Sequence, residues 1–365
     1  MTSSKPSRRH KATSTKQAID LALQGGGSHG AFTWGVLDRL LEDETLEIAA
    51  ISGTSAGAMN AVALASGLMD GGREGAQRVL RQFWTRVAEL SPFYSLQTSP
   101  LGTLMGPAQA WIEPWFKPWT DPLQQAADAL GHTLSPYQLN PLNLNPLRDI
   151  LVDTVDFDRA RRCHKTQLFI AATQVRTGAL RIFGQHELTA DMVLASACLP
   201  LLFQAVEIDG EAYWDGGYAG NPSLLPLLTE TRADDLLLVQ INPTLRDTVP
   251  TTARDILDRI NEVTFNASLI KELRTLAMMK ELVGDKPPAG GTDLLERVRQ
   301  LRVHLIEGGT ALSALGAGSK TNTQWSFLAN LHAMGREAAD RWLHDHRGDL
   351  GHRSTLDIGR ALHGP

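Results

Sequence analysis

The sequence predicts an α/β protein built around a mostly parallel sheet, and three observations carry that prediction. Residues 18–70 alternate twice between a short apolar run and a segment of helical spacing, the pattern of parallel strands joined by helices. Residues 236–241 are continuously apolar, as expected for a parallel strand buried on both faces. Each of the first two predicted strands ends in a glycine-rich turn that opens a helix, as in many α/β proteins that bind ligands.

Length and composition describe an ordinary globular protein. The 365 residues are enough for one large domain or two modest ones. With 42% hydrophobic residues and a formal net charge of −5, the chain gives no support for nucleic-acid binding through bulk electrostatics. Its two cysteines, Cys163 and Cys198, are too few for a disulfide framework and fit a reducing compartment.

The ends of the chain are expected to lie outside the folded domain, which we place at residues 17–345. Residues 1–16 carry five lysines and arginines and no acidic residue, and they lack the apolar core of a secretory signal. We therefore expect a disordered basic tail on a cytoplasmic protein. Residues 346–365 are polar and are expected to fray as a C-terminal tail. No stretch of the sequence has the length and apolarity of a bilayer-spanning helix.

Further strands and helices follow the first 70 residues. Residues 167–175 and 179–183 flank a turn that ends in Gly178, which predicts a hairpin. A second hairpin is predicted where Asp209 and Gly210 separate two short apolar runs, residues 204–208 and 212–214. Apolar spacing predicts helices over residues 73–90, 147–155, 188–197, 252–283 and 323–344, a loop over 284–292 and a last strand over 302–306.

Residues 91–146 interrupt this alternation with an insertion rich in proline and tryptophan. Half of the eighteen prolines lie here, and they would break the helix that the four-residue spacing of Trp111, Trp115 and Trp119 suggests. Two interpretations remain open. The insertion could act as a lid or a membrane-contacting patch beside the second glycine-rich turn, or its aromatic side chains could simply pack it onto the domain.

The second glycine-rich turn has the form G-x-S-x-G, with Gly53, Ser55 and Gly57 at its fixed positions. This form places a serine on a tight strand-to-helix bend, where its hydroxyl is presented to substrate. The helix that follows directs its free N–H groups and the positive end of its dipole at the same point. Ser55 is therefore the candidate nucleophile of an acyl transfer.

The first glycine-rich turn, which contains Gly25, Gly26, Gly27 and Gly30, has two interpretations. Its row of backbone N–H groups at a helix start could stabilise an oxyanion. The same residues also match the G-x-G-x-x-G pattern of dinucleotide-binding proteins. That pattern requires an acidic residue near the end of the next strand, but the nearest acid, Glu47, lies at its beginning. A nucleotide-binding protein is therefore the weaker alternative.

A serine nucleophile requires a base, and an aspartate is better placed for this role than any histidine. None of the eleven histidines lies in a recognisable triad setting; His186 and His304 come nearest, but both have the pattern of ordinary strand-edge residues. Asp215 follows a short apolar strand and precedes Gly216 and Gly217, which allow a sharp turn toward another loop. Burial there would raise the pKa of Asp215 from about 3.9, as a base at neutral pH requires.

Together these motifs resemble the patatin-like phospholipases, lipid acyl hydrolases that use a Ser–Asp dyad. The resemblance covers residues 18–310 and rests on the glycine-rich loop, the elbow, residues 195–200 and the turn after Asp215. It implies a three-layer α/β/α fold, a nucleophile at Ser55 and its base at Asp215. Oxyanion N–H groups would come from Gly25, Gly26, Gly27 and Ala56. Supporting positions would be His29, Gly30, Gly53, Gly57, Gly216 and Gly217, and Ser196 and Pro200 would shape the adjacent wall.

The resemblance also implies a substrate and a chemistry without a cofactor. The expected activity is of the phospholipase A or lysophospholipase type, through an acyl-enzyme that needs no metal, and the histidines lack zinc-ligand spacing. His29 stands where the family commonly has arginine or lysine, and histidine is mostly neutral at pH 7. A carboxylesterase or thioesterase acting on neutral esters therefore remains an alternative, as does peripheral membrane contact through residues 91–146.

Overall fold

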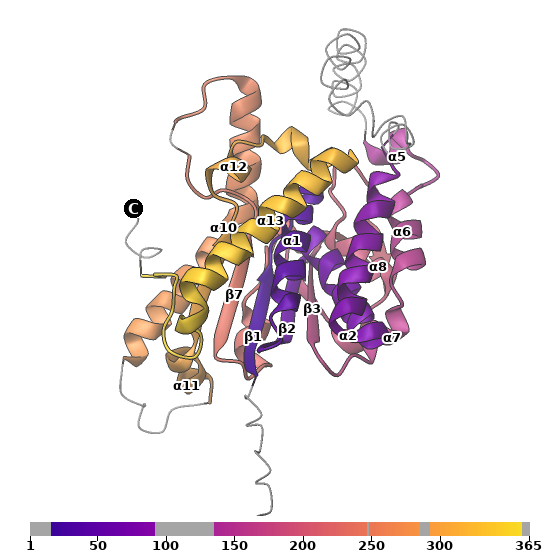
Figure 1. Ribbon diagram of the computed structural model, residues 1–365. Helices are drawn as coiled ribbons and strands as arrows, with labels where there is room; N and C mark the ends of the chain where they lie inside the picture. The colour runs from indigo at the N-terminus through magenta and orange to yellow at the C-terminus, as the bar shows by residue number, and fades with distance from the viewer. Residues whose placement is uncertain (1–15, 92–134, 247, 285–292, 360–365) are drawn as a thin grey trace, which may run out of the picture.

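The computed structural model describes residues 16–91, 135–246, 248–284 and 293–359. Within these residues one sheet runs in the order β5-β6-β3-β2-β1-β7-β8, with β4 paired to β3 (Figure 1). The strands are β1 (Gln17–Leu23), β2 (Leu46–Thr54), β3 (Gln167–Gln174), β4 (Leu180–Gly184), β5 (Val206–Ile208), β6 (Glu211–Asp215), β7 (Asp235–Gln240) and β8 (Arg302–Glu307). The strands from β3 through β2, β1 and β7 to β8 are parallel, and β4, β5 and β6 are antiparallel, so the prediction of a mostly parallel sheet is confirmed.

Helices cover both faces of the sheet and give three α/β/α layers. The helices are α1 (Gly30–Glu42), α2 (Ala56–Ala88), α5 (Pro136–Leu139), α6 (Pro146–Thr154), α7 (Phe157–Arg161), α8 (Ala190–Ser196), α9 (Leu225–Thr229), α10 (Ala253–Val283), α11 (Asp293–Gln300), α12 (Gly309–Ser313) and α13 (Trp325–His346). Short 3₁₀ turns are η1 (Gly27–His29), η2 (Gln185–Glu187), η3 (Gly216–Tyr218), η4 (Ala317–Thr321) and η5 (Arg347–Asp349).

Alternation along the strands divides the core between the two faces. On β1, Leu21 and Leu23 join the larger core under α1, α2, α8 and α13, whereas Ala22 joins the smaller core under α9, α10 and α11. The same alternation sets Leu237 against Leu238 on β7. A strand that is apolar at every position is the expected sequence of a strand covered on both faces.

Several local predictions can be compared directly with the structure. Both hairpins form: β3 pairs with β4 and β5 pairs with β6, each antiparallel. The predicted helix break before residue 73 appears inside α2 as non-helical backbone at Gly71 and Gly72. The tryptophans Trp111, Trp115 and Trp119 lie outside the described residues. Within the described part of the chain, no helix combines the length and apolar composition needed to span a membrane.

The C-terminal segment is more ordered than its polar sequence suggests. Contrary to the expectation of a frayed tail, the N–H groups of Thr355 and Leu356 donate to the carbonyl of Val303 at 3.1 and 3.0 Å. The N–H of Gly351 donates to the carboxylate of Asp235. β8 is an edge strand with unpaired backbone groups, so a polar segment can be held there without a large apolar surface of its own.

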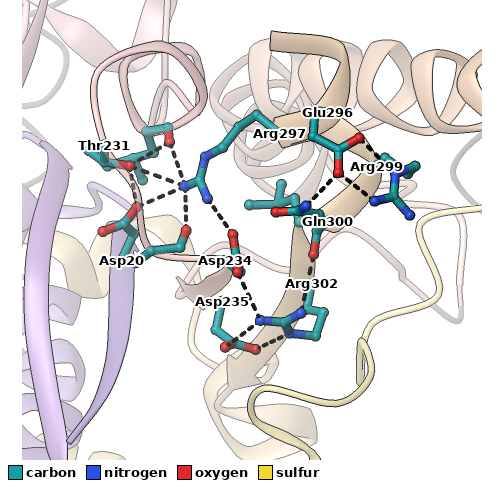
Figure 2. Close-up of polar contacts among 12 residues, drawn as sticks. Asp20, Thr231, Asp234, Asp235, Glu296, Arg297, Arg299, Gln300 and Arg302 are labelled. Atoms are coloured by element: carbon teal, nitrogen blue, oxygen red, sulfur yellow. Dashed lines mark hydrogen bonds and ion pairs between the residues drawn. The ribbon is translucent and has the colours of Figure 1, made fainter. Parts of the chain in front are cut away.

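An ionic cluster ties the sheet to α11 (Figure 2). It lies at the end of the sheet where β7 begins, opposite the end where the glycine-rich turns follow β1 and β2. Arg297 lies between Asp20, at 3.6 Å, and Asp234, at 2.9 Å, while Arg302 pairs with Asp235 at 2.9 Å. Burial raises the pKa of Asp20 to about 7, although Thr231 and Arg297 favour its ionised form. The pKa of Asp235 is instead held low because hydrogen bonds from its neighbours outweigh its burial.

Candidate active site at the carboxyl edge of the sheet

Ser55 occupies a strained bend between β2 and α2. Its backbone has φ 54° and ψ −122°, a conformation that costs a non-glycine residue about 1–3 kcal/mol and persists only where the surroundings enforce it. A side chain on Gly57 would overlap the carbonyl oxygen of Leu23, and one on Gly53 would lie 2.8 Å from the oxygen of Gly57. The N–H of Ser55 donates to Oγ of Ser196 at 2.9 Å, so the wall predicted around Ser196 contacts the bend directly.

Asp215 ends β6 with its carboxylate completely buried behind Ser55. The Gly217 N–H donates to Oδ1 at 2.7 Å, whereas Oδ2 has no partner of standard hydrogen-bond geometry among the described residues. The Ser55 hydroxyl nevertheless faces the carboxyl closely enough to lower its pKa. The two side chains therefore face each other without standard hydrogen-bond geometry, as is common before substrate binds.

Burial is the largest influence on the pKa of Asp215. It raises the pKa of this carboxyl to about 7, against the opposing effects of the Gly217 N–H, the Ser55 hydroxyl and the charge of Lys320. The turn that buries it depends on its two glycines. A side chain on Gly216 would overlap the carbonyl of Ala171, and one on Gly217 would overlap the ring of Phe265.

The first glycine-rich turn lies against the elbow, but its N–H groups are not equivalent. A Cβ on Gly25 would lie 2.6 Å from Cβ of Ser55, so the turn approaches Ser55 as an oxyanion loop must. The N–H of Gly25, which we expected to face an oxyanion, instead donates to Oδ1 of Asn221 at 2.7 Å. Among the described residues, no acceptor is found for the N–H of Gly26 or Gly27. Ala56 begins α2, and the first N–H groups of a helix have no intrahelical partner.

A network of buried amide side chains fixes this loop. Gln24 accepts hydrogen bonds from the N–H groups of Ile241 and Asn242 and donates to Asn266 at 2.8 Å. Asn242 in turn donates to the carbonyl of Gly25 at 2.7 Å. Sequence reasoning missed these residues; the one available signal was Gln24, a polar residue at the end of an apolar strand and directly before the glycines.

His29 and Gly30 join the loop to its surroundings. Nε2 of His29 lies 2.7 Å from Oγ of Ser319, and the ring is buried. Burial and the nearby charge of Lys320 lower the pKa of His29 to about 4, so this histidine is neutral at pH 7, as expected. The carbonyl of Gly30 accepts a hydrogen bond from Asn60 at 3.0 Å, which links the first turn to α2.

Lys320 is the charged residue of the site that sequence reasoning did not find. Its carbonyl oxygen lies directly against Gly27, where any side chain would overlap it. Its ammonium group donates to Oδ1 of Asn261 at 2.8 Å and lies 5.4 Å from the centre of the Phe265 ring. No sequence motif marks Lys320, which comes from η4, almost 300 residues after the glycine-rich loop.

The structure does not support the two competing interpretations, a histidine base and a nucleotide-binding site. His304 is fully buried against Asp235 at 3.0 Å, within the ionic cluster on the far side of the sheet, and His186 is exposed in η2. Glu47 is exposed at the beginning of β2 rather than at its end, where a ribose-binding acid would have to lie. Within the described ranges, no group of three or more His, Cys, Asp or Glu side chains is arranged to hold a metal ion.

One groove of the described structure lies away from this site. It has a volume of about 490 Å³ and runs along the outer face of α10, where Val263, Asn266 and Met278 contribute to its lining. Neither Ser55 nor Asp215 lines it. Ser55 keeps 6% of its surface exposed and Asp215 none.

Comparisons with known proteins show the family of the chain. The family model described as patatin-like phospholipase matches residues 21–228, which is more than half of the chain. No curated protein sequence gives a match. Among solved structures, the chain is similar to VipD from Legionella pneumophila, with 15% identity, coverage of 90% of this chain and 67% of VipD, and a TM-score of 0.40.

A second similar structure is that of full-length SpcU in complex with full-length ExoU from the type III secretion system of Pseudomonas aeruginosa. The identity is 14%, the alignment covers 95% of this chain and 77% of the matched chain, and the TM-score is 0.29. The matched family region contains both glycine-rich turns and the turn after Asp215. The chain therefore belongs to the patatin-like phospholipases, a family of lipid hydrolases.

Proposed function

We propose that this chain is a lipid acyl hydrolase of the phospholipase A or lysophospholipase type, with Ser55 as the nucleophile and Asp215 as its base. One observation carries the proposal: a serine is held in a strained backbone conformation, and its hydroxyl faces a fully buried carboxylate. Strain of this kind is retained where surrounding structure enforces it, and it is concentrated at functional sites. The family membership of the chain supports the same activity.

The first half of the proposed reaction forms an acyl-enzyme. Oγ of Ser55 attacks the ester carbonyl while its proton passes to the carboxylate of Asp215. The carbonyl oxygen becomes an oxyanion, and the N–H groups of Gly26, Gly27 and Ala56 are the donors that remain available to it. The intermediate collapses, the bond to the alcohol breaks, and the alcohol leaves with the proton held by Asp215.

The second half repeats the chemistry with water. Asp215 takes a proton from a water molecule as that water attacks the acyl carbonyl of Ser55. Collapse of the second oxyanion releases the fatty acid, and the proton returns to Oγ of Ser55. A carboxyl whose pKa is near 7 suits both roles, because it is partly ionised at neutral pH and still basic enough to accept a proton.

The decisive experiment compares Ser55→Ala, Asp215→Asn and the wild type on a short-chain p-nitrophenyl ester and on phospholipid vesicles. We expect both variants to lose activity on both substrates by about a thousandfold or more. Asp20→Asn is the matched control because Asp20 is also buried with a raised pKa but lies in the ionic cluster on the far side of the sheet. Near-full activity of Asp215→Asn would contradict the assignment of the base.

Hydrolysis of neutral esters or thioesters is the second candidate activity, and His29 is the observation that favours it. A neutral side chain at this position gives the glycine loop no fixed cation of its own for an anionic head group. The ratio of vesicle hydrolysis to hydrolysis of the soluble ester distinguishes the two. A ratio well below one would favour the esterase.

We also propose that the enzyme contacts the membrane through two apolar rims beside the site. The first rim includes the described end of the insertion and the loop before β5: Tyr137, Leu139, Leu142, Leu144, Leu201 and Leu202, all exposed. The Tyr137 hydroxyl accepts from the N–H of Ala205 at 3.2 Å, which joins the two segments. The second rim is the exposed face of the first turns of α10: Ile256, Leu257, Ile260 and Val263.

Both rims lie toward the end of the sheet where the site is. In Figure 1, α5 and the first turns of α10 stand at the upper end of the molecule, toward which β1 runs. Exposed apolar groups around a lipid hydrolase site are suited to a bilayer surface. We expect Leu142→Ser with Leu144→Ser to weaken sedimentation with phospholipid vesicles. Leu282→Ser, equally exposed at the other end of α10, is the control; equal binding of both variants would contradict the proposal.

A further inference from the structure

We infer that Lys320 is a positioning residue that holds the carboxylate of Asp215 in its ionised, proton-accepting form. The inference deepens the proposed function and rests on it, since it presupposes that Asp215 is the base. Lys320 belongs to none of the four sequence motifs, and it would act on Asp215 through its positive charge.

The geometry places the ammonium group of Lys320 beside the turn that carries Asp215. The ammonium lies 5.4 Å from the centre of the Phe265 ring on α10. The same ring packs so closely on Gly217 that a Cβ there would overlap it. Because Gly217 is the residue whose N–H binds Oδ1 of Asp215, the lysine, the ring and the carboxylate form one packed group.

The surroundings of Lys320 leave its charge incompletely compensated. Its ammonium contacts a neutral amide oxygen, that of Asn261, and the face of the Phe265 ring. Nearby Glu262 is engaged by Arg246 and Arg259, each at 3.1 Å, so its charge is shared with two guanidinium groups. A half-buried ammonium is favoured by an anion nearby, and the buried carboxylate of Asp215 is one of the anions whose charge acts on this lysine.

Three acidic residues act on the charge of Lys320. Glu262, Asp258 and Asp215 all favour the protonated form of Lys320, although burial lowers the pKa of this lysine to about 8. At pH 7 the lysine therefore remains mostly charged.

The groups on the other side of Asp215 bring no charge. Burial raises the pKa of the Cys198 thiol to about 12 and also raises the pKa of Tyr218, so both are neutral. His29 is neutral as well. Among the described residues, Lys320 is thus the cation whose charge favours ionised Asp215.

A purely structural role for Lys320 is the main alternative. Its carbonyl closes against Gly27, and the neighbouring Ser319 binds His29, so this segment also fastens the glycine loop. Loss of that fastening would lower activity at every pH. Loss of the charge would instead change the pH at which the base becomes ionised, and this difference separates the two roles.

The test is the pH dependence of kcat/KM on a neutral short-chain p-nitrophenyl ester, measured between pH 5 and 9 for Lys320→Met, Lys320→Gln and Lys320→Arg. We expect Met and Gln to raise the midpoint of the acidic limb by about one pH unit. Activity at pH 6 would then fall about tenfold more than activity at pH 9, and Arg would restore the wild-type midpoint. Gln keeps a polar group for Asn261, so it remains informative if Met does not fold.

Lys280→Met is the matched control. Lys280 is also half-buried and donates to a backbone carbonyl, that of Leu301, but it lies at the other end of α10. Its loss should leave the midpoint unchanged. An unchanged midpoint in both Lys320→Met and Lys320→Gln would overturn the inference, whatever their total activity.

The same experiment separates failure of the inference from failure of the proposed function. If Asp215→Asn stays active, the assignment of the base fails. If Asp215→Asn is inactive and the Lys320 variants keep the wild-type midpoint, only the role of Lys320 fails. A loss of hydrolysis by Lys320→Met on anionic vesicles but not on the neutral ester would assign Lys320 to head-group binding and overturn the inference.

Discussion

Replacement of Asp215 by asparagine should stabilise the protein at neutral and alkaline pH while it removes activity. The carboxyl is fully buried, and its pKa is raised from 3.8 to about 7. Between these two values the folded state binds the proton more tightly than the unfolded state does. The free energy of unfolding therefore falls as the pH rises through this range, and above pH 7 the full penalty for a buried charge is present.

The magnitude follows from the two pKa values. At about 1.36 kcal/mol for each pH unit, the difference between 3.8 and about 7 corresponds to about 4 kcal/mol. Asparagine has nearly the same shape as the protonated acid and does not ionise. The variant should therefore match the wild type near pH 4 and exceed it by up to about 4 kcal/mol at pH 8, a large share of the usual stability of a domain.

Urea unfolding followed by tryptophan fluorescence, repeated at pH values from 4 to 8, measures this difference. Asp20 contributes a pH dependence of the same sign, but it is present in both proteins and cancels in the subtraction. The quantity to plot is the free energy of unfolding of Asp215→Asn minus that of the wild type. A difference that does not change between pH 4 and pH 8 would refute the assignment of a raised pKa to this carboxyl.

Three further outcomes are expected. Gly57→Ala places a methyl group against the carbonyl of Leu23, so urea unfolding should show a free energy of unfolding lower by more than about 2 kcal/mol. Gly348→Ala, which has open space around it, should unfold as the wild type does. Ser55→Gly relieves the strained φ of 54° and should gain about 1–3 kcal/mol in calorimetry, a gain that Ser55→Ala should lack. Because the folded protein holds His29 in its neutral form, the wild type should lose up to about 3 kcal/mol of stability as the pH falls from 6.5 to 4. Urea unfolding of His29→Gln should show a smaller loss over the same pH range.

The parts of the site that the sequence predicted are those with short-range geometric requirements. The bend at Ser55 needs small residues two positions away on each side, and the turn after Asp215 needs two glycines, so each leaves a local pattern. The strands could be predicted equally well, because a strand buried on both faces requires a continuous apolar run. His29 was correctly expected to be neutral, and its burial, with the charge of Lys320, lowers its pKa further than its position in a loop indicated.

What the sequence did not predict depends on contacts between distant segments. Asn242, Asn266 and Lys320 are single polar residues in otherwise unremarkable surroundings, and only the folded chain brings them to the glycine loop. The engagement of the Gly25 N–H by Asn221 is invisible for the same reason. The ordered C-terminal segment was missed because its polar composition shows only that it has no apolar core of its own. The composition gives no sign that the edge strand β8 offers backbone groups to which this segment binds.

The dependence of the glycine loop on residues after 228 limits how this protein can be divided. A fragment that ends where the family match ends would contain both proposed reacting side chains but none of Asn242, Asn266 and Lys320. It would also lack β7, so one edge of β1 would be open. The boundary of the family match is thus not a boundary of the folded unit, and expression of the matched region alone would yield the two proposed reacting side chains without the contacts that hold the glycine loop.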